Sequence, residues 1–183
     1  MSDDRRWSSW YIMSEGFGLS RASAEDHELL TTWMNDPDVA EFWQLDGPPE
    51  RTIAYLTELN KATHTRGYVG SLDGTPMSYW ELYWADLDPL AKHYDARPFD
   101  AGIHLLLGPS DFRGRGLGAQ LLEAVARTIL ALRPEVSRVV AEPDVRNVRS
   151  IAAFERAGFV RAADLDLPDK RAVLMIKTRE PHD

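Results

Sequence analysis

The chain has 183 residues, of which 44% are hydrophobic and 27% are charged, so it carries enough apolar material for one buried core. It has no cysteine, which excludes disulfides, thiolate catalysis and cysteine-based zinc sites, and its five histidines show no metal-ligand spacing. We therefore predict no metal. The net charge of −8 disfavours nucleic acid as a partner and is compatible with a cationic small substrate.

The N-terminus gives no targeting or membrane signal. Residues 1–6 are polar, and no apolar run reaches the length needed to span a bilayer. We expect a cytoplasmic protein with no membrane partner. Residues 1–16 are expected to form a polar extension that packs in part, and residues 17–183 a single domain. The sequence does not distinguish a monomer from a homodimer.

The first half of the chain predicts short elements separated by proline and glycine breaks. They are a strand, three helices and two hairpin strands, at residues 17–21, 24–34, 37–43, 51–62, 67–72 and 77–84. Asp73-Gly74 joins the last two because this dipeptide favours the primed hairpin turns. Residues 85–100 form a connection long enough to serve as a lid or to contact substrate.

The second half predicts strands and helices in alternation, followed by two closing strands. These elements are expected at residues 103–107, 119–132, 138–141, 148–157, 160–165 and 171–177. This order predicts an α/β fold with one mixed, mostly antiparallel sheet and helices on both of its faces.

A glycine-rich segment, Arg113-Gly114-Arg115-Gly116-Leu117-Gly118, precedes the predicted helix at 119–132. Such a turn leaves backbone N–H groups aimed outward, where the helix dipole favours an anion, and the arginines can add charge. The pattern indicates a diphosphate site, but glycines that only form a tight turn would look the same. The distance from the preceding strand argues against a dinucleotide fingerprint, and no Gly-Lys-Ser/Thr follows, which excludes a P-loop.

This segment resembles the R/Q-x-x-G-x-G/A signature of the GNAT acetyltransferase superfamily, which is matched by Arg113, Gly116 and Gly118. Residues 147–159 are similar to the Asn-led helix ending in Gly-Phe of the same enzymes. The resemblance covers roughly residues 100–178. It implies a GNAT fold, acetyl-CoA or another acyl-CoA as co-substrate, and a small-molecule amine as acceptor. The residues assigned to the acyl-CoA are Leu105, Leu107, Arg113, Gly114, Arg115, Gly116, Leu117, Gly118, Asn147 and Phe154.

A narrower likeness lies in residues 101–109, 141–147 and 167–171, which resemble siderophore-biosynthetic N-acyltransferases of the aerobactin and mycobactin type. It implies acylation of lysine or N6-hydroxylysine. Two alternatives stay open. Aminoglycoside 6′-N-acetyltransferases share the helix start and the hairpin, but carry an acid where this chain has His104. A catalytically silent acyl-CoA sensor is the other, because Phe154 stands where many GNAT enzymes place a proton-donating tyrosine.

His104 is the candidate general base, because it is one polar group on a largely apolar strand and titrates near neutrality. A core histidine bonded to a backbone carbonyl is the alternative. Asp144 follows Pro143, which ends its strand and leaves the carboxylate at an edge where α/β ligands gather. If the strands are neighbours, as the resemblance implies, Asp144 orients the imidazole or binds the acceptor ammonium. Helix capping is the alternative for both Asp144 and Asn147.

The second hairpin strand supplies the candidate acceptor pocket. Glu81 shares one face of the strand with Tyr79 and Tyr83, while Trp80 points to the other face. Glu81 is predicted to bind the substrate ammonium, and Trp80 is a second substrate-binding candidate. A solvated strand glutamate is the common alternative. The sequence thus predicts an acyl-CoA-dependent N-acyltransferase acting on a lysine-like amine.

Overall fold

The computed structural model describes residues 5–13 and 16–180. The chain divides into two units. The N-terminal unit comprises Met1–Leu82 and Leu105–Arg113, and the C-terminal unit comprises Tyr83–His104 and Gly114–Asp183. Residues 1–4 and 14–15 of the predicted N-terminal extension lie outside the described residues. The single domain expected over residues 17–183 stays a prediction.

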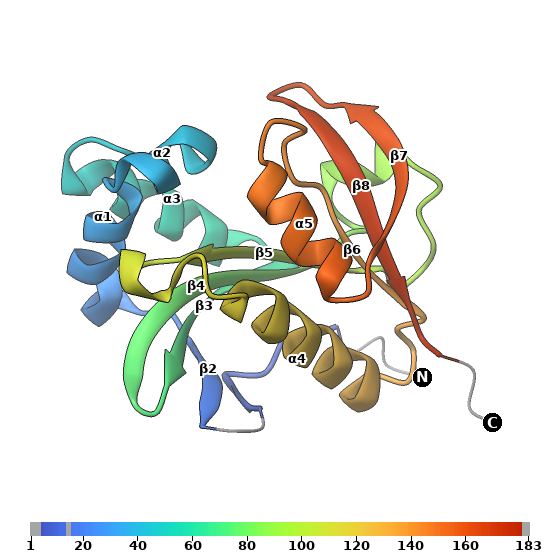
Figure 1. The fold of residues 1–183 in the computed structure, drawn as a ribbon, viewed down its shortest axis with the longest axis horizontal. Helices are drawn as coiled ribbons and strands as arrows, with labels where there is room; N and C mark the ends of the chain where they lie inside the picture. The colour runs from blue at the N-terminus through green and yellow to red at the C-terminus, as the bar shows by residue number, and fades with distance from the viewer. Residues whose placement is uncertain (1–4, 14–15, 181–183) are drawn as a thin grey trace. The chain divides into compact units, whose positions relative to one another are not determined.

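The strands belong to one mixed sheet. Their bounds are β1 Trp10–Ile12, β2 Phe17–Arg21, β3 Thr65–Leu72, β4 Thr75–Trp84, β5 Ala101–Leu107, β6 Arg138–Ala141, β7 Val160–Asp166 and β8 Arg171–Thr178. Their hydrogen-bonded order is β1-β2-β3-β4-β5-β6-β8-β7. Figure 1 labels β2 to β8. β5 and β6 pair in parallel, whereas β1–β2, β2–β3, β6–β8 and β7–β8 are antiparallel. The predicted single mixed, mostly antiparallel sheet is confirmed.

The N-terminal unit contains the helices α1 His27–Met34, α2 Pro37–Trp43 and α3 Pro49–Lys61. Helix α1 packs against α3 and α2, and their apolar side chains meet those of the sheet in one buried cluster. That cluster includes Leu30, Trp33, Met34, Leu56, Val69, Tyr79 and Leu106. It fixes the helices on the strands of this unit, because its members are almost entirely removed from water.

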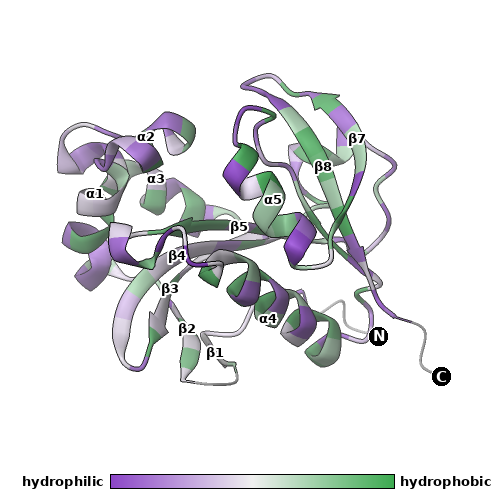
Figure 2. Cartoon of the chain, viewed as in Figure 1, coloured by the Kyte–Doolittle hydropathy of each residue, from purple (hydrophilic) through white to green (hydrophobic). Residues whose placement is uncertain are grey.

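The C-terminal unit contains α4 Leu117–Leu132 and α5 Val148–Arg156. Hydrophobic and hydrophilic bands alternate along α4, as Figure 2 shows, and its buried residues recur at helical spacing. α4 packs against α5 and β6.

No helix in the described part of the chain is both long and apolar enough to cross a membrane.

Several element bounds differ from those predicted. The helix expected at 24–34 opens as a 3-10 turn, Ala24–Asp26, before α1 begins. α3 begins earlier, at Pro49, because proline is well accommodated at the first helical position. α4 begins at Leu117, so the end of the glycine segment is already helical. The three-residue strand β1 was not predicted, since so short a strand carries too little alternation to recognise.

The connection at 85–100 is fastened at its end by a buried ion pair. Asp100 is fully buried, and its carboxylate accepts hydrogen bonds from Nε and Nη2 of Arg138 at 2.7 and 2.8 Å. The Tyr94 hydroxyl and the Arg97 backbone N–H donate to the same carboxylate. The carbonyl of Asp100 also accepts from the backbone N–H of Ala85, which closes the base of the loop. These hydrogen bonds hold the C-terminal end of the 85–100 connection against β6 and close its base.

Replacing Asp100 with Asn is expected to destabilise the protein by about 3–5 kcal/mol, because it leaves the buried Arg138 guanidinium without its counter-charge. The free energy of unfolding in urea measures the effect. Glu58→Gln is the control, since Glu58 forms an exposed pair with Lys61 that contributes little. Equal stability of the Asp100 variant and the wild type would contradict this role.

Candidate active site

The site is organised by the parallel pairing of β5 with β6. Ala101 lies opposite Val139, and Gly102 lies opposite Val140. Continuing this register by two residues brings His104 level with Glu142, the residue that follows β6. The two side chains meet: Nε2 of His104 is hydrogen-bonded to Oε1 of Glu142.

Tyr83 completes the group from β4. Its hydroxyl donates to Oε2 of Glu142, and its ring centroid lies 4.7 Å from that of His104. A Cβ atom at Gly102 would lie 2.1 Å from the Tyr83 ring, so a residue without a side chain is needed beneath the tyrosine. Both oxygens of the Glu142 carboxylate are thus held by ring side chains.

Glu142 is ionised in this arrangement. Only 7% of the residue is exposed, and burial by itself raises the pKa of the carboxyl. The nearby His104 and Lys170 charges and the hydrogen bonds from His104 and Tyr83 outweigh burial and lower the pKa below its ordinary value. Because an ionised carboxylate only accepts hydrogen bonds, His104 donates from Nε2 whether it is charged or neutral, and in the neutral form its lone pair is on Nδ1.

Tyr83 stays a hydrogen-bond donor. Burial raises the pKa of its hydroxyl well above the ordinary value, and the charge of Glu142 raises it further. The phenol therefore keeps its proton and directs it at Glu142.

Asp144 was predicted to orient His104 or to bind the acceptor ammonium, and in the structure its carboxylate is bonded to Arg146. Its carboxylate accepts from the backbone N–H, Nε and Nη2 of Arg146 at 2.8, 3.0 and 2.9 Å. The hydrogen bond from Arg146 is the main reason that the pKa of Asp144 is lowered, although burial opposes it. The carboxylate beside the imidazole is that of Glu142, which precedes Asp144 by two residues and stands in register with His104. A catalytic role for Asp144 stays a prediction.

Sequence reasoning missed Glu142. The signal that could have found it is its place immediately before Pro143, at the end of the apolar strand 138–141. Pro143 drew attention to the residue after it, although pairing with β8 continues past the proline at Asp144, opposite Ala172. The residue before Pro143 is the one that stands level with His104.

The glycine segment has the backbone that a diphosphate would need. Gly114 and Gly116 have φ angles of 71° and 74°, in the left-handed region that favours glycine. Gly116 is the N-cap of α4, and a Cβ atom at either glycine would meet nothing within 4 Å. Leu117 and Gly118 form the first turn, whose N–H groups have no partner inside the helix. Arg115 is exposed. These features fit an anionic group bound by backbone N–H groups.

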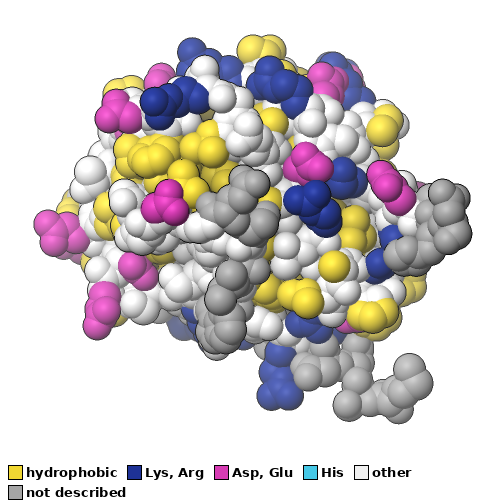
Figure 3. Space-filling model, turned by 60° about the horizontal axis from the view of Figure 1, so that its bottom comes forward, with side chains coloured by type: hydrophobic (Ala, Val, Ile, Leu, Met, Phe, Trp, Pro, Cys, Tyr) yellow, Lys and Arg dark blue, Asp and Glu magenta, His cyan; other side chains and the backbone are white. Residues whose placement is uncertain are grey.

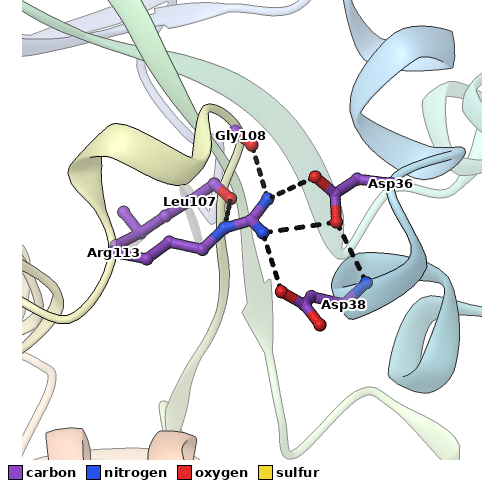
Figure 4. A network of polar contacts seen from close by, with 5 residues as sticks. All are labelled: Asp36, Asp38, Leu107, Gly108 and Arg113. Carbon is purple, nitrogen blue, oxygen red and sulfur yellow. Dashed lines mark hydrogen bonds and ion pairs between the residues drawn. The ribbon is translucent and has the colours of Figure 1, made fainter.

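The first residue of the segment behaves differently. The side chain of Arg113 is only 17% exposed, and its guanidinium bonds to carboxylates and carbonyls of the N-terminal unit (Figure 4). Its predicted contact with the acyl-CoA stays a prediction.

Asn147 and Phe154, which were also assigned to the acyl-CoA, have structural partners in the C-terminal unit. Asn147 is the N-cap of α5, and its Oδ1 accepts from the Ser150 N–H at 3.1 Å, as the capping alternative predicts. Phe154 is buried and meets Phe159 edge to face, with ring centroids 5.0 Å apart. Leu105 and Leu107 are half-buried on β5. Their binding roles stay predictions.

Glu81 lies in the N-terminal unit and is 4% exposed, so it is not the solvated glutamate of the alternative reading. Its Oε1 accepts from the hydroxyls of Tyr55 at 2.5 Å and Tyr79 at 3.1 Å. Burial is the largest cause that raises the pKa of Tyr79, and the charge of Glu81 adds to it. Tyr55 comes from α3 and was not predicted, because its sequence position gives no sign of the pairing.

Trp80 is a core residue. It is fully buried, its Nε1–H donates to Ser78 Oγ at 2.8 Å, and its ring packs on that of Phe17. These contacts lie on the face of β4 opposite Glu81. The suggested contact of Trp80 with substrate stays a prediction.

Within residues 5–13 and 16–180, no group of three or more His, Cys, Asp and Glu side chains could hold a metal ion.

On the face shown in Figure 3, Lys and Arg side chains are interspersed with Asp and Glu.

Comparison with known proteins defines the class. The family model described as "Acetyltransferase (GNAT) domain" matches residues 22–167, which is most of the chain. The chain therefore belongs to the GNAT acetyltransferase family, and the resemblance and fold predicted from its sequence are confirmed.

Three similar proteins have known names. The chain is 37% identical over 154 residues to the N(6)-hydroxylysine O-acetyltransferase of Escherichia coli, covering 84% of this chain and 49% of the relative. It is 34% identical to the lysine N-acyltransferase MbtK of Mycobacterium tuberculosis, covering 86% and 75%. The crystal structure of the aminoglycoside acetyltransferase AAC(6′)-Ib with coenzyme A has a TM-score of 0.79 at 29% identity, covering 89% and 95%. The chain thus spans about half the length of the first relative.

The lowered pKa of Glu142 makes the stability of the fold depend on pH. Ionised Glu142 stabilises the fold above the ordinary glutamate pKa of about 4.3, and this stabilisation is lost as the pH falls through the lowered value. Glu142→Gln removes the charge. The difference in unfolding free energy between wild type and variant should therefore be largest near neutral pH and shrink below about pH 4.

Urea denaturation at a series of pH values measures this difference. Glu123→Gln, which removes an exposed glutamate of α4, is the control. A difference that is constant from neutral to acidic pH would show that Glu142 is not held ionised by its neighbours.

Proposed function

We propose that this protein transfers an acyl group from acetyl-CoA or another acyl-CoA to the side-chain nitrogen of lysine or N6-hydroxylysine, in the assembly of a hydroxamate siderophore. The observation that carries the proposal is the imidazole of His104 fixed by a buried, ionised carboxylate. Membership of the GNAT family and the name of the Mycobacterium tuberculosis relative support acylation of a lysine nitrogen. The name of the Escherichia coli relative, an O-acetyltransferase, supports N6-hydroxylysine as the acceptor molecule.

His104 is the general base in this proposal, acting through Nδ1. Donation of Nε2–H to Glu142 leaves the lone pair on Nδ1, which accepts the proton that the acceptor nitrogen loses on acylation. Glu142 then stabilises the imidazolium, and Tyr83 keeps Glu142 in place. Phe154 has no acidic proton. The proton for the leaving thiolate therefore has to come from charged His104, from water or from a residue of the N-terminal half.

The acyl donor is assigned to the glycine segment. Gly114, Gly116 and the first-turn N–H groups of α4 would hold its diphosphate, and the bound acyl-CoA would supply the activated thioester. Open space above both glycines supports this assignment.

The acceptor is assigned to Glu81. Glu81 is a buried carboxylate that accepts from two tyrosine hydroxyls, and a carboxylate attracts an ammonium group through a charge-assisted hydrogen bond. This arrangement favours a basic amino acid or another small polyamine as substrate.

Aminoglycoside acetylation is the second candidate function. It is favoured by the structural likeness to AAC(6′)-Ib, which extends over 95% of that chain. An amine-rich sugar would also suit Glu81. The acceptor assay below distinguishes the two.

Replacing His104 with Ala is expected to lower turnover about 10²-fold or more and to leave acyl-CoA binding nearly unchanged, because only proton removal is lost. Steady-state kinetics and calorimetric titration with coenzyme A measure the two quantities. His93→Ala is the matched control, an exposed histidine in the 85–100 loop. Unchanged turnover of the His104 variant would exclude its role as base.

The acceptor is tested directly by giving the purified protein mixed acyl-CoAs with lysine, N6-hydroxylysine, ornithine and an aminoglycoside. We expect mass spectrometry to find acylated lysine or acylated N6-hydroxylysine. Acylation of the aminoglycoside alone would favour the second function. If the protein binds coenzyme A but releases free thiol in none of the mixtures, both acyltransferase functions are excluded. The hypothesis of a catalytically silent acyl-CoA sensor would then stand.

A further inference from the structure

All three guanidinium nitrogens of Arg113 contact protein acceptors. Nε–H donates to the carbonyl of Leu107 at 3.1 Å, and Nη2 donates to that of Gly108 at 2.6 Å. Nη2 also contacts Asp36 Oδ2 at 3.2 Å, while Nη1 contacts Asp36 Oδ1 at 3.2 Å and Asp38 Oδ2 at 3.3 Å. Of the five N–H donors of a guanidinium, four make hydrogen bonds here, and the Nη2–Asp36 contact adds an ion pair (Figure 4). Most of the hydrogen-bonding capacity of Arg113 is therefore used within the protein.

The two carboxylates belong to the start of α2. Asp36 is the N-cap, and its Oδ1 also accepts from the backbone N–H of Asp38 at 2.9 Å. The hydrogen bond from Arg113 is the main reason that the pKa of Asp36 is lowered, so the carboxylate is ionised against the guanidinium. One side chain therefore ties the end of β5 to the beginning of α2.

The other end of α2 reaches the carboxylate assigned to the acceptor. Trp43, the last residue of the helix, packs edge-on against Tyr79, with ring centroids 5.6 Å apart. Tyr79 in turn donates to Glu81. A continuous set of contacts in the N-terminal unit thus runs from Arg113 through α2 to Glu81.

We propose that Arg113 is a positioning residue for the acceptor site, which holds α2, and with it Trp43 and Tyr79, in the place that Glu81 requires. It does this instead of binding the diphosphate of the acyl donor. This inference rests on the proposed function, because the acceptor role of Glu81 is part of that proposal. Arg113 is followed directly by Gly114, so the residue that orders the acceptor side borders the segment assigned to the donor.

The test uses the double variant Asp36→Asn with Asp38→Asn. Asparagine caps a helix as well as aspartate does, so α2 keeps its start and Arg113 keeps its two carbonyls, while both ion pairs are lost. We expect the KM for lysine to rise about five- to tenfold. We expect the dissociation constant of coenzyme A, measured by calorimetry, to change less than about twofold. Hydrogen exchange of the amides in residues 37–43 should become faster.

The control is Glu41→Gln, which neutralises an exposed carboxylate on the same helix and should leave all three quantities unchanged. Tighter binding of coenzyme A by the double variant, with an unchanged KM for lysine, would overturn the proposal, because it would mean that the released guanidinium binds phosphate. Unchanged exchange in residues 37–43 would also overturn it. If the wild type acylates no lysine, the proposed function fails, while coenzyme A affinity and hydrogen exchange still decide the role of Arg113.

Discussion

The parallel register between β5 and β6 is the constraint on which the C-terminal unit depends. Residues in contact across this pair are separated by 38 positions in the sequence, and the same separation relates Asp100 to Arg138 and His104 to Glu142. Positions two apart lie on one face of a strand, so both charged pairs stand on the same face. A slip of one residue would put every one of these groups opposite the wrong partner. Because the Asp100–Arg138 ion pair favours this register, it also favours the alignment of His104 with Glu142.

Between the two pairs lies Gly102, and its missing side chain is what admits the ring of Tyr83. The tyrosine hydroxyl satisfies the second oxygen of Glu142, which would otherwise be a buried acceptor without a donor. Burial, which opposes ionisation of Glu142, is overcome by the combined effect of His104, Tyr83 and Lys170. The result is an imidazole held in one tautomer. That is the property a general base needs, since the reacting nitrogen is defined before substrate arrives.

The two arginines of the glycine segment have different surroundings. Arg115 is exposed, whereas Arg113 is half-buried among acceptors of the N-terminal unit. In the proposed donor site, an anion at this segment would therefore depend on backbone N–H groups and on the left-handed glycines more than on Arg113. Arg113, the first position of the family signature, is bonded within the protein, and Asp36 and Asp38 balance its charge.

Local features of the sequence determined the elements and the chemical groups that could act. Asp73-Gly74 predicted the hairpin, and both residues have positive φ angles. The glycines predicted the start of α4 to within two residues, and the polar side chain in an apolar strand singled out His104. Only the tertiary structure decided the partners. Glu142 replaced Asp144 beside the imidazole, and Arg113 found Asp36 and Asp38, which are 77 and 75 residues away. Propensity and periodicity act over a few residues, whereas strand register and helix packing bring together groups whose separation along the chain carries no local signal.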